Sequence, residues 1–316
     1  MKILITEPEY FPQELSDELK QGHTVIAGRP NHEYLLKEVG DVDALVVRVE
    51  TKIDKAVLDS AKNLKLIASM TTGLDHIDLA EAGKRGIEVI NCPEYATTAT
   101  AEYTMSIILS LVRNIPWAFE SFKNGKRDRH SFLGGELQGK TLGVVGFGKI
   151  GSRVAKYAKA FGMDVLFYDP YIDKNNSKDV EAKQVTLEEL VERSDVITIH
   201  AFLSKETKYL INRETFSKMK SNAVVVNASR GQIIDEDALV SALDNKTIAG
   251  AALDVFGEEP LPHPHKLTEY ARSHNNLLLT PHIAGSTKES VYSAARLVID
   301  KILETPSKKS MQSQSK

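Results

Sequence analysis

Three side chains that can exchange protons or bind anions follow predicted strands in the second half of the chain. Arg230, Glu259 and His282 each come soon after a short apolar run. The carboxyl ends of parallel strands meet at one edge of a sheet, where ligands bind, so we expect these side chains to lie close together. A carboxylate beside an imidazole fixes its tautomer and stabilises its protonated form. The set predicts acid–base chemistry on a substrate that an arginine can hold.

A glycine motif stands upstream of these residues. Gly146, Gly148 and Gly151 have the spacing GxGxxG, and they lie between an apolar run and a helical pattern. The first glycine permits a tight turn, the second a close approach to a pyrophosphate, and the third close packing of helix on strand. Asp169 ends the next apolar run, where a carboxylate binds ribose hydroxyls and repels a 2′-phosphate. The motif predicts NAD as the cofactor.

Composition restricts the class of protein. The chain has 316 residues, 42% hydrophobic content and a formal net charge of −3. These values favour a globular protein of two domains and disfavour nucleic-acid or membrane-surface binding. No apolar run reaches the roughly 18 residues of a membrane span, and we expect no signal peptide.

The cysteine and histidine residues suggest neither a disulfide nor a metal site. Cys92 is the single cysteine, so no internal disulfide can form, which fits a cytoplasmic protein, and we expect Cys92 to be a buried packing residue. His263 and His265 stand in a proline-containing segment that we expect to be a solvated loop. They lack further ligands at metal-binding spacing, so no metal is predicted.

Strand and helix patterns alternate along the whole chain, which predicts α/β architecture with two doubly wound parallel-sheet domains. A long apolar helix from Ala101 should end near residues 114–116. The predicted strands are 3–6, 24–27, 44–48, 64–69, 89–91, 142–145, 165–168, 196–200, 223–227, 248–253 and 277–280. The other predicted helices include 12–20, 32–39, 55–61, 79–85, 187–193, 215–219, 236–243 and 286–303.

The position of the glycine motif predicts how the domains are arranged. We expect residues 1–98 to form the first part of a substrate domain and residues 99–285 a Rossmann-type NAD domain inserted into it. Residues 286–316 should return to the substrate domain as a helix with a polar tail. Two chain crossovers would then form a hinge beside a ligand cleft.

The chain resembles the D-isomer-specific 2-hydroxyacid dehydrogenases. The matching stretches are Gly146–Gly151 with Asp169, residues 226–231, residues 252–260 and residues 280–287. The resemblance implies a flavodoxin-like substrate domain, a homodimer built on helices of the NAD domain, and hydride transfer between NAD and a small 2-hydroxy or 2-oxo acid. It makes His282 the acid/base, Glu259 its partner and Arg230 the residue that holds the substrate.

The same resemblance implies binding roles for further residues. Thr72, Gly73 and Leu74 match a loop whose backbone amides hold the substrate carboxylate. Thr71 stands where the family usually has glycine, and Phe202 where it usually has proline. The residues expected to line the NAD site are Thr72, Gly146, Gly148, Lys149, Ile150, Gly151, Asp169, Ala201, Thr207, Ala228, Arg230, Asp254, His282 and Gly285.

Within the family, the strongest likeness is to the phosphoglycerate dehydrogenases, in a short form without a regulatory domain. Arg48 and Arg129 match their phosphate-contacting segments, and guanidinium geometry suits phosphate. Ser69 stands where an arginine is common. Reduction of glyoxylate or hydroxypyruvate, or D-lactate-type chemistry, is therefore the alternative. The scaffold also occurs in NAD-sensing corepressors, and a binding protein of that class is the alternative outside enzymes.

Overall fold

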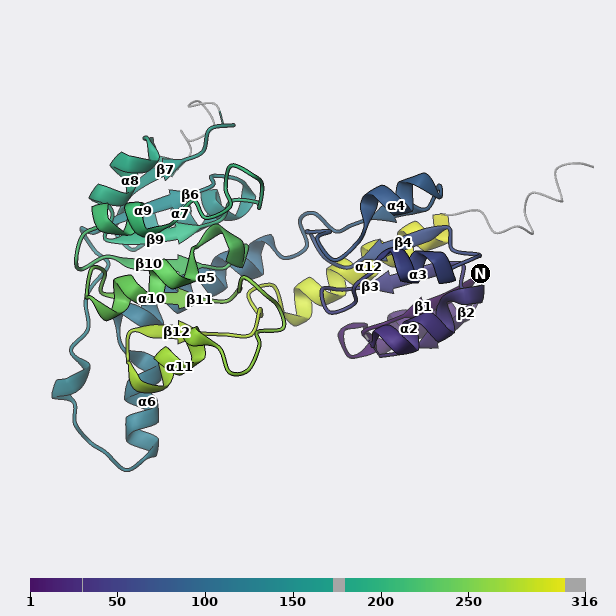
Figure 1. The fold of residues 1–316 in the computed structure, drawn as a ribbon, viewed down its shortest axis with the longest axis horizontal. Helices are drawn as coiled ribbons and strands as arrows, with labels where there is room; N and C mark the ends of the chain where they lie inside the picture. The colour runs from purple at the N-terminus through teal and green to yellow at the C-terminus, as the bar shows by residue number, and fades with distance from the viewer. Residues whose placement is uncertain (30, 173–179, 305–316) are drawn as a thin grey trace, which may run out of the picture. The chain divides into compact units, whose positions relative to one another are not determined.

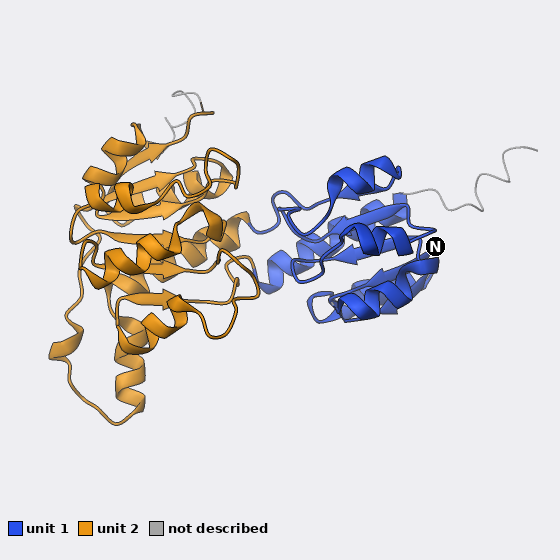
Figure 2. Cartoon of the chain, viewed as in Figure 1, with its two compact units in different colours: residues 1–96, 286–316 blue, residues 97–285 orange. Residues whose placement is uncertain are grey.

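The computed structural model describes residues 1–29, 31–172 and 180–304, so the predicted polar tail lies outside the described residues. The chain forms two compact units. Unit 1 consists of residues 1–96 and 286–316, and unit 2 of residues 97–285 (Figure 2). No helix of the described part is long and apolar enough to cross a membrane.

Unit 1 is built on a five-stranded parallel sheet with the order β2-β1-β3-β4-β5. This order is that of flavodoxin-like doubly wound folds and confirms the predicted fold class for this unit. Its strands are β1 (Lys2–Ile5), β2 (Thr24–Ala27), β3 (Ala44–Val47), β4 (Leu66–Ser69) and β5 (Glu88–Ile90). Its helices are α1 (Gln13–Lys20), α2 (His32–Glu38), α3 (Lys55–Ser60), α4 (Leu79–Lys84) and α12 (Lys288–Glu304), with short 3-10 turns η1 (Pro8–Tyr10) and η2 (Val39–Asp41).

Both faces of this sheet are covered by helices, as Figure 1 shows. Strand β3 is buried throughout, and its side chains alternate between two apolar clusters. Ala44 and Val46 pack with α1 and α12, whereas Leu45 and Val47 pack with α2 and α3. Because both faces of such a parallel strand are buried, its sequence is a continuous apolar run, and this makes it recognisable in the sequence.

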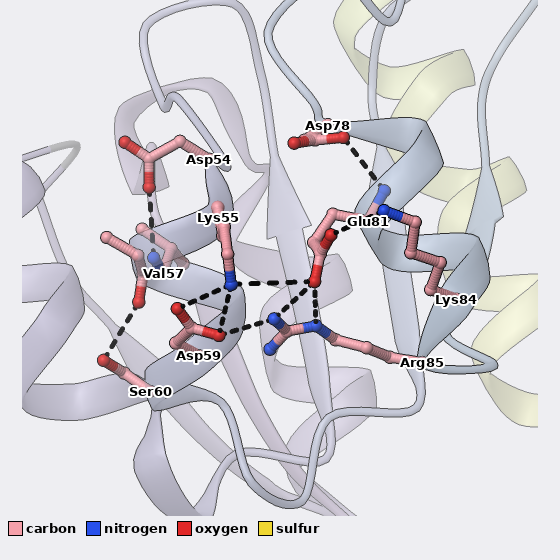
Figure 3. A network of polar contacts seen from close by, with 10 residues as sticks. Asp54, Lys55, Val57, Asp59, Ser60, Asp78, Glu81, Lys84 and Arg85 are labelled. Carbon is pink, nitrogen blue, oxygen red and sulfur yellow. Dashed lines mark hydrogen bonds and ion pairs between the residues drawn. The ribbon is translucent and has the colours of Figure 1, made fainter.

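Helices α3 and α4 are tied together at the surface by a polar network (Figure 3). Asp54 caps α3, and Asp78 caps α4, each by accepting a bond from a first-turn amide. Arg85 then bridges Glu81 of α4 at 2.7 Å and Asp59 of α3 at 2.5 Å. Single ion pairs at a protein surface contribute little stability, so the network mainly fixes the relative position of two short helices.

Unit 2 contains a seven-stranded parallel sheet with the order β12-β11-β10-β9-β6-β7-β8. The order around β6 is that of a Rossmann fold, with the reversal between β6 and β9. The strands are β6 (Thr141–Val145), β7 (Asp164–Tyr168), β8 (Lys183–Gln184), β9 (Val196–Ile199), β10 (Val224–Asn227), β11 (Gly250–Leu253) and β12 (Leu277–Leu279). The sequence predicted only six strands, because β8 is a polar dipeptide that shows no strand pattern.

The helices of unit 2 include two that the sequence pattern does not predict, α6 and α11. The helices are α5 (Thr97–Val112), α6 (Ile115–Lys123), α7 (Lys149–Ala160), α8 (Leu187–Arg193), α9 (Arg213–Lys218), α10 (Glu236–Asp244) and α11 (Lys266–Ser273), with 3-10 turns η3 (His130–Phe132) and η5 (Gly231–Ile233). In the sequence, Pro116 indicates only the end of the long helix. Asn114 has a φ of 54°, and Pro116 stands in the first turn of α6, where its missing N–H costs nothing.

Candidate active site

The glycine turn lies between β6 and α7, and packing explains two of its glycines. Gly146 has a φ of 89°, and a Cβ there would lie 2.6 Å from the backbone nitrogen of Ala201. A Cβ on Gly151 would lie 2.1 Å from the carbonyl oxygen of Gly146. Gly148 precedes α7 as its N-cap, with Lys149 and Ile150 in the first helical turn. This turn leaves helix amides available for an anion, as a dinucleotide pyrophosphate requires.

Asp169 follows β7 and is bonded to the glycine turn. Its Oδ2 accepts a bond from the Phe147 amide at 2.8 Å, and its Oδ1 accepts one from the Tyr171 amide at 2.9 Å. The carboxylate is thereby fixed beside the turn where the sequence analysis expects a ribose. Each carboxylate oxygen retains acceptor capacity for a hydroxyl donor.

Three other predicted cofactor residues lie after strands of the same sheet. Ala201 follows β9 and touches the glycine turn as described, and Ala228 follows β10. Thr207 lies in the loop after Ala201, and its hydroxyl donates to the Phe202 carbonyl at 2.7 Å. That hydroxyl also accepts a bond from the Ser204 amide at 2.7 Å, so Thr207 closes its own loop.

Arg230 is positioned by the loop after β10. The Asn227 side chain donates to the Arg230 carbonyl at 2.9 Å and accepts from the Ser229 amide at 3.0 Å. The next residue, Gly231, packs so tightly that a Cβ would lie 1.9 Å from the carbonyl carbon of Phe256. This contact brings the Arg230 loop against the segment that carries Glu259.

Glu259 and His282 form the hydrogen-bonded pair that the sequence analysis expects. His282 Nδ1 and Glu259 Oε2 are 2.6 Å apart, and Glu259 Oε1 accepts from the Phe256 amide at 2.9 Å. Burial alone would raise the pKa of the Glu259 carboxyl, but the bond from His282 and the charges of His282 and Arg230 outweigh it and lower the pKa. A carboxylate only accepts, so Nδ1 carries the proton and Nε2 remains for a substrate.

Asp254 holds the turn that carries His282. Its carboxylate is completely buried and accepts bonds from the amides of Ile283 at 3.0 Å and Ala284 at 2.8 Å. The amide of His282 donates to the Asp254 carbonyl at 2.9 Å, and His282 has a φ of 52°. A left-handed backbone conformation is uncommon for residues other than glycine, and residues held in it cluster at functional sites. The turn continues to Gly285, the last residue of unit 2.

Two hydroxyls complete the surroundings of Asp254, and sequence reasoning missed both. Thr280 Oγ1 donates to Asp254 Oδ1 at 2.7 Å, and the Tyr103 hydroxyl donates to the same oxygen at 3.1 Å. Burial raises the pKa of the Tyr103 hydroxyl, which therefore stays protonated. Tyr103 lies in the apolar pattern of α5, so nothing in its sequence neighbourhood pointed to the site.

The predicted carboxylate loop, residues 72–74, lies in unit 1 after β4. Three consecutive carbonyls in this loop are bonded: Thr71 O to the Cys92 amide, Thr72 O to Asn91 Nδ2, and Gly73 O to Thr71 Oγ1. No acceptor is found among the described residues for the amides of Thr72, Gly73 and Leu74. A run of unpaired amides of this kind binds anions.

Arg48 is buried at the end of β3 in unit 1. Its guanidinium lies 4.3 Å from the ring centroid of Tyr10, and only 6% of the residue is exposed. Its Nε and Nη1 have no partner within the described part of the chain. Glu7 binds the Arg48 amide at 3.0 Å and the Thr51 hydroxyl at 2.8 Å, and burial raises the pKa of the Glu7 carboxyl. An anion would satisfy the two orphaned donors.

Arg129 lies elsewhere, in unit 2, where it is exposed and precedes η3. The structure thus places the two expected phosphate contacts in different units. Cys92 is fully buried, as predicted, and burial raises the pKa of its thiol to about 12.

The expectation of a solvated loop is wrong for His265, one of the two histidines in that segment. Its side chain is 18% exposed, caps α11 through the Leu267 amide, and approaches Glu236 at 3.5 Å. No group of three or more possible metal ligands occurs among the residues that the structure describes.

Comparison with known proteins identifies the family. The model of the "D-isomer specific 2-hydroxyacid dehydrogenase, NAD binding domain" matches residues 105–284. A D-3-phosphoglycerate dehydrogenase of Archaeoglobus fulgidus is 40% identical over 305 residues, which cover 96% of this chain and 57% of that protein. The chain therefore spans little more than half the length of that relative.

Two further proteins match over most of their length. A glyoxylate reductase of Thermofilum pendens is 43% identical over 277 residues, covering 85% of this chain and 79% of that protein. The solved structure of an Aquifex aeolicus D-lactate dehydrogenase with NAD and lactic acid is 31% identical, with a TM-score of 0.83, covering 95% of this chain and 94% of that one. The chain belongs to the D-isomer-specific 2-hydroxyacid dehydrogenase family, and residues 105–284 are its NAD-binding domain.

Proposed function

We propose that this protein is an NAD-dependent dehydrogenase that interconverts a 2-hydroxy acid and its 2-oxo acid. The observation that carries this proposal is the His282–Glu259 pair at 2.6 Å, which follows strands of the same sheet that bears the glycine turn. An NAD-sensing corepressor would need the dinucleotide site but no acid–base pair. Turnover of NADH with a 2-oxo acid separates the two classes.

The residues of unit 2 divide the work as follows. The glycine turn and Asp169 would hold NAD, which would supply or accept the hydride at C2 of the substrate. His282 Nε2 donates a proton to the substrate oxygen during reduction and accepts one during oxidation, while Glu259 stabilises the protonated imidazole. Arg230 holds the substrate carbonyl or carboxylate by charge-assisted bonds. Asp254 and Tyr103 keep the His282 turn in its left-handed conformation.

We propose D-3-phosphoglycerate as the leading substrate. Its carboxylate would bind the amides of residues 72–74, and its phosphate would bind Arg48, whose Nε and Nη1 lack partners among the described residues. The likeness to D-3-phosphoglycerate dehydrogenases at 40% identity supports this assignment.

Reduction of glyoxylate or hydroxypyruvate is the second candidate, and two observations favour it. Ser69 is fully buried, its hydroxyl lies 2.7 Å from that of Thr71, and it presents no cation to a phosphate. The likeness to a glyoxylate reductase, which is 43% identical over 277 residues, also supports this candidate.

Replacing Glu259 with glutamine should move the alkaline limb of the pH–rate profile for reduction to lower pH. The lowered pKa of Glu259 keeps it ionised at neutral pH, and its contribution disappears only as pH falls through that lowered value. Glutamine removes the negative charge that lies 2.6 Å from His282 Nδ1 and stabilises the protonated imidazole, so this limb should move to lower pH. If the alkaline limb of the kcat profile lies at the same pH in Glu259→Gln as in the wild-type enzyme, the proposed role of the His282–Glu259 pair is wrong.

The cofactor preference should depend on Asp169. Its carboxylate would lie beside the 2′-phosphate of NADPH, so kcat/KM should favour NADH by about tenfold or more. Asp169→Ala should narrow that ratio mainly by weakening the binding of NADH. The variant also loses the hydrogen bond from the Phe147 amide, which lies in the glycine turn. Equal kcat/KM values for NADH and NADPH with the wild-type enzyme would exclude this role.

We propose a cytoplasmic homodimer that binds neither nucleic acid nor membranes. The net charge of −3 and the single cysteine support the location and the lack of polyanionic partners. Helix α6 buries none of its residues, and Phe119 and Phe122 are 67% and 65% exposed. Light scattering of the wild-type protein should give twice the mass of one chain. The double variant Phe119→Glu/Phe122→Glu should give the mass of one chain. A monomeric wild-type protein would refute the dimer.

A further inference from the structure

The three free amides of the carboxylate loop are oriented by the carbonyls that precede them. In a trans peptide, the C=O of one residue and the N–H of the next point in opposite directions. The Thr71 and Thr72 carbonyls are bonded to Cys92 and Asn91, so the amides of Thr72 and Gly73 point away from that segment. The third amide, that of Leu74, depends on the Gly73 carbonyl, which accepts a hydrogen bond from Thr71 Oγ1 at 2.7 Å.

Thr71 is itself held by two further side chains. Ser69 Oγ lies 2.7 Å from Thr71 Oγ1 and 3.1 Å from His76 Nε2. Thr71 and Ser69 are 3% and 0% exposed, so water does not compete for these hydroxyls. The two hydroxyls join a histidine ring nitrogen to a backbone carbonyl.

The direction of every bond in this chain follows from the number of protons. A carbonyl only accepts, so Thr71 spends its single hydroxyl proton on Gly73 O. Ser69 must then donate to Thr71, which leaves His76 Nε2 to donate to Ser69. The bonds therefore run one way, from His76 through Ser69 and Thr71 to the Gly73 carbonyl.

We propose that His76, Ser69 and Thr71 are positioning residues that orient the Leu74 amide toward the carboxylate of the substrate. This inference rests on the proposed function of residues 72–74. Without the Thr71 hydroxyl, the Gly73–Leu74 peptide loses its anchor and samples other orientations, so carboxylate binding weakens. None of the three side chains takes part in hydride or proton transfer, so the chemical step should be untouched.

The test compares Thr71→Val with Thr71→Ser in steady-state reduction of glyoxylate and hydroxypyruvate by NADH. Thr71→Val should raise both KM values and the inhibition constant of oxamate by about 2- to 12-fold, the effect of one neutral hydrogen bond. The kcat, the Kd for NADH and the Tm should change little, and Thr71→Ser should restore wild-type values. Thr104→Val is the matched control, because Thr104 is also fully buried and bonded to a backbone carbonyl.

The order of the hydrogen bonds from His76 through Ser69 to Thr71 gives a second test. As a single substitution, Ser69→Ala should raise KM. In the double variant with Thr71→Val it should raise KM no further, because Ser69 acts through Thr71. His76→Gln, which keeps an N–H donor, should preserve KM, whereas His76→Phe should raise it. Wild-type KM in Thr71→Val, no rescue by serine, or additive effects would overturn the inference. If the wild-type enzyme reduces no 2-oxo acid, the proposed function itself fails.

Discussion

Alanine at position 282 is expected to lower kcat by about 10²- to 10⁴-fold, the usual effect of losing a general acid/base. The expectation rests on His282 Nδ1 being fixed by Glu259 at 2.6 Å, which leaves Nε2 for the substrate. NADH binding should stay nearly unchanged, because the glycine turn and Asp169 lie elsewhere in unit 2. Stopped-flow single turnovers and a fluorescence titration with NADH measure the two quantities separately.

The control for this variant is His263→Ala, which removes an exposed histidine from the same unit. It should leave kcat and the Kd for NADH unchanged. Retained turnover in His282→Ala together with weaker NADH binding would show that His282 serves the cofactor rather than proton transfer.

Arg48→Ala should raise KM for 3-phosphoglycerate by about 10- to 150-fold, the effect of losing a charge-assisted hydrogen bond. The KM for hydroxypyruvate and glyoxylate should stay the same, because neither carries a phosphate. Nε and Nη1 of the buried guanidinium have no hydrogen-bond partner among the described residues, so a phosphate that reaches them would displace none. Initial rates with both substrate types test this difference.

Loss of the guanidinium also removes packing against Tyr10, so a second variant is needed. Arg48→Lys keeps the charge but loses the Nε and Nη1 donors, and its KM for the phosphorylated substrate should be intermediate. Arg129→Ala should raise the same KM only if that exposed side chain reaches the phosphate. Equal effects of Arg48→Ala on phosphorylated and unphosphorylated substrates would contradict the phosphate role.

The elements that sequence predicted well are those whose burial is strongly patterned. Strands β3 and β4 are completely buried and were visible as apolar runs. Boundaries were less accurate, since capping decides them. Helix α9 begins at Arg213 rather than Thr215, because Asn212 and Thr215 form a capping box. Helix α11 was missed because an unusual cap, His265, begins it after a proline-containing segment.

The residues that carry the chemistry of the site were more predictable than the hydrogen bonds that hold them in place. Glycine spacing and strand-end positions pointed to Gly146, Arg230, Glu259 and His282. The bonds around Asp254 were not predictable, since Tyr103 is far away in sequence and stands in an apolar helix. The hydrogen bonds through Ser69 and Thr71 were not predictable either. Which of two neighbouring hydroxyls donates depends on their contacts in three dimensions.

The most direct test of the proposed dehydrogenase activity is the initial rate of wild-type enzyme with NADH and a panel of glyoxylate, hydroxypyruvate and pyruvate, and with NAD and D-3-phosphoglycerate. We expect turnover with at least one of these acids, and we expect it to be lost on replacement of His282 and retained in His263→Ala. Tight NADH binding without turnover of any member of the panel would contradict the proposed dehydrogenase and favour a binding protein.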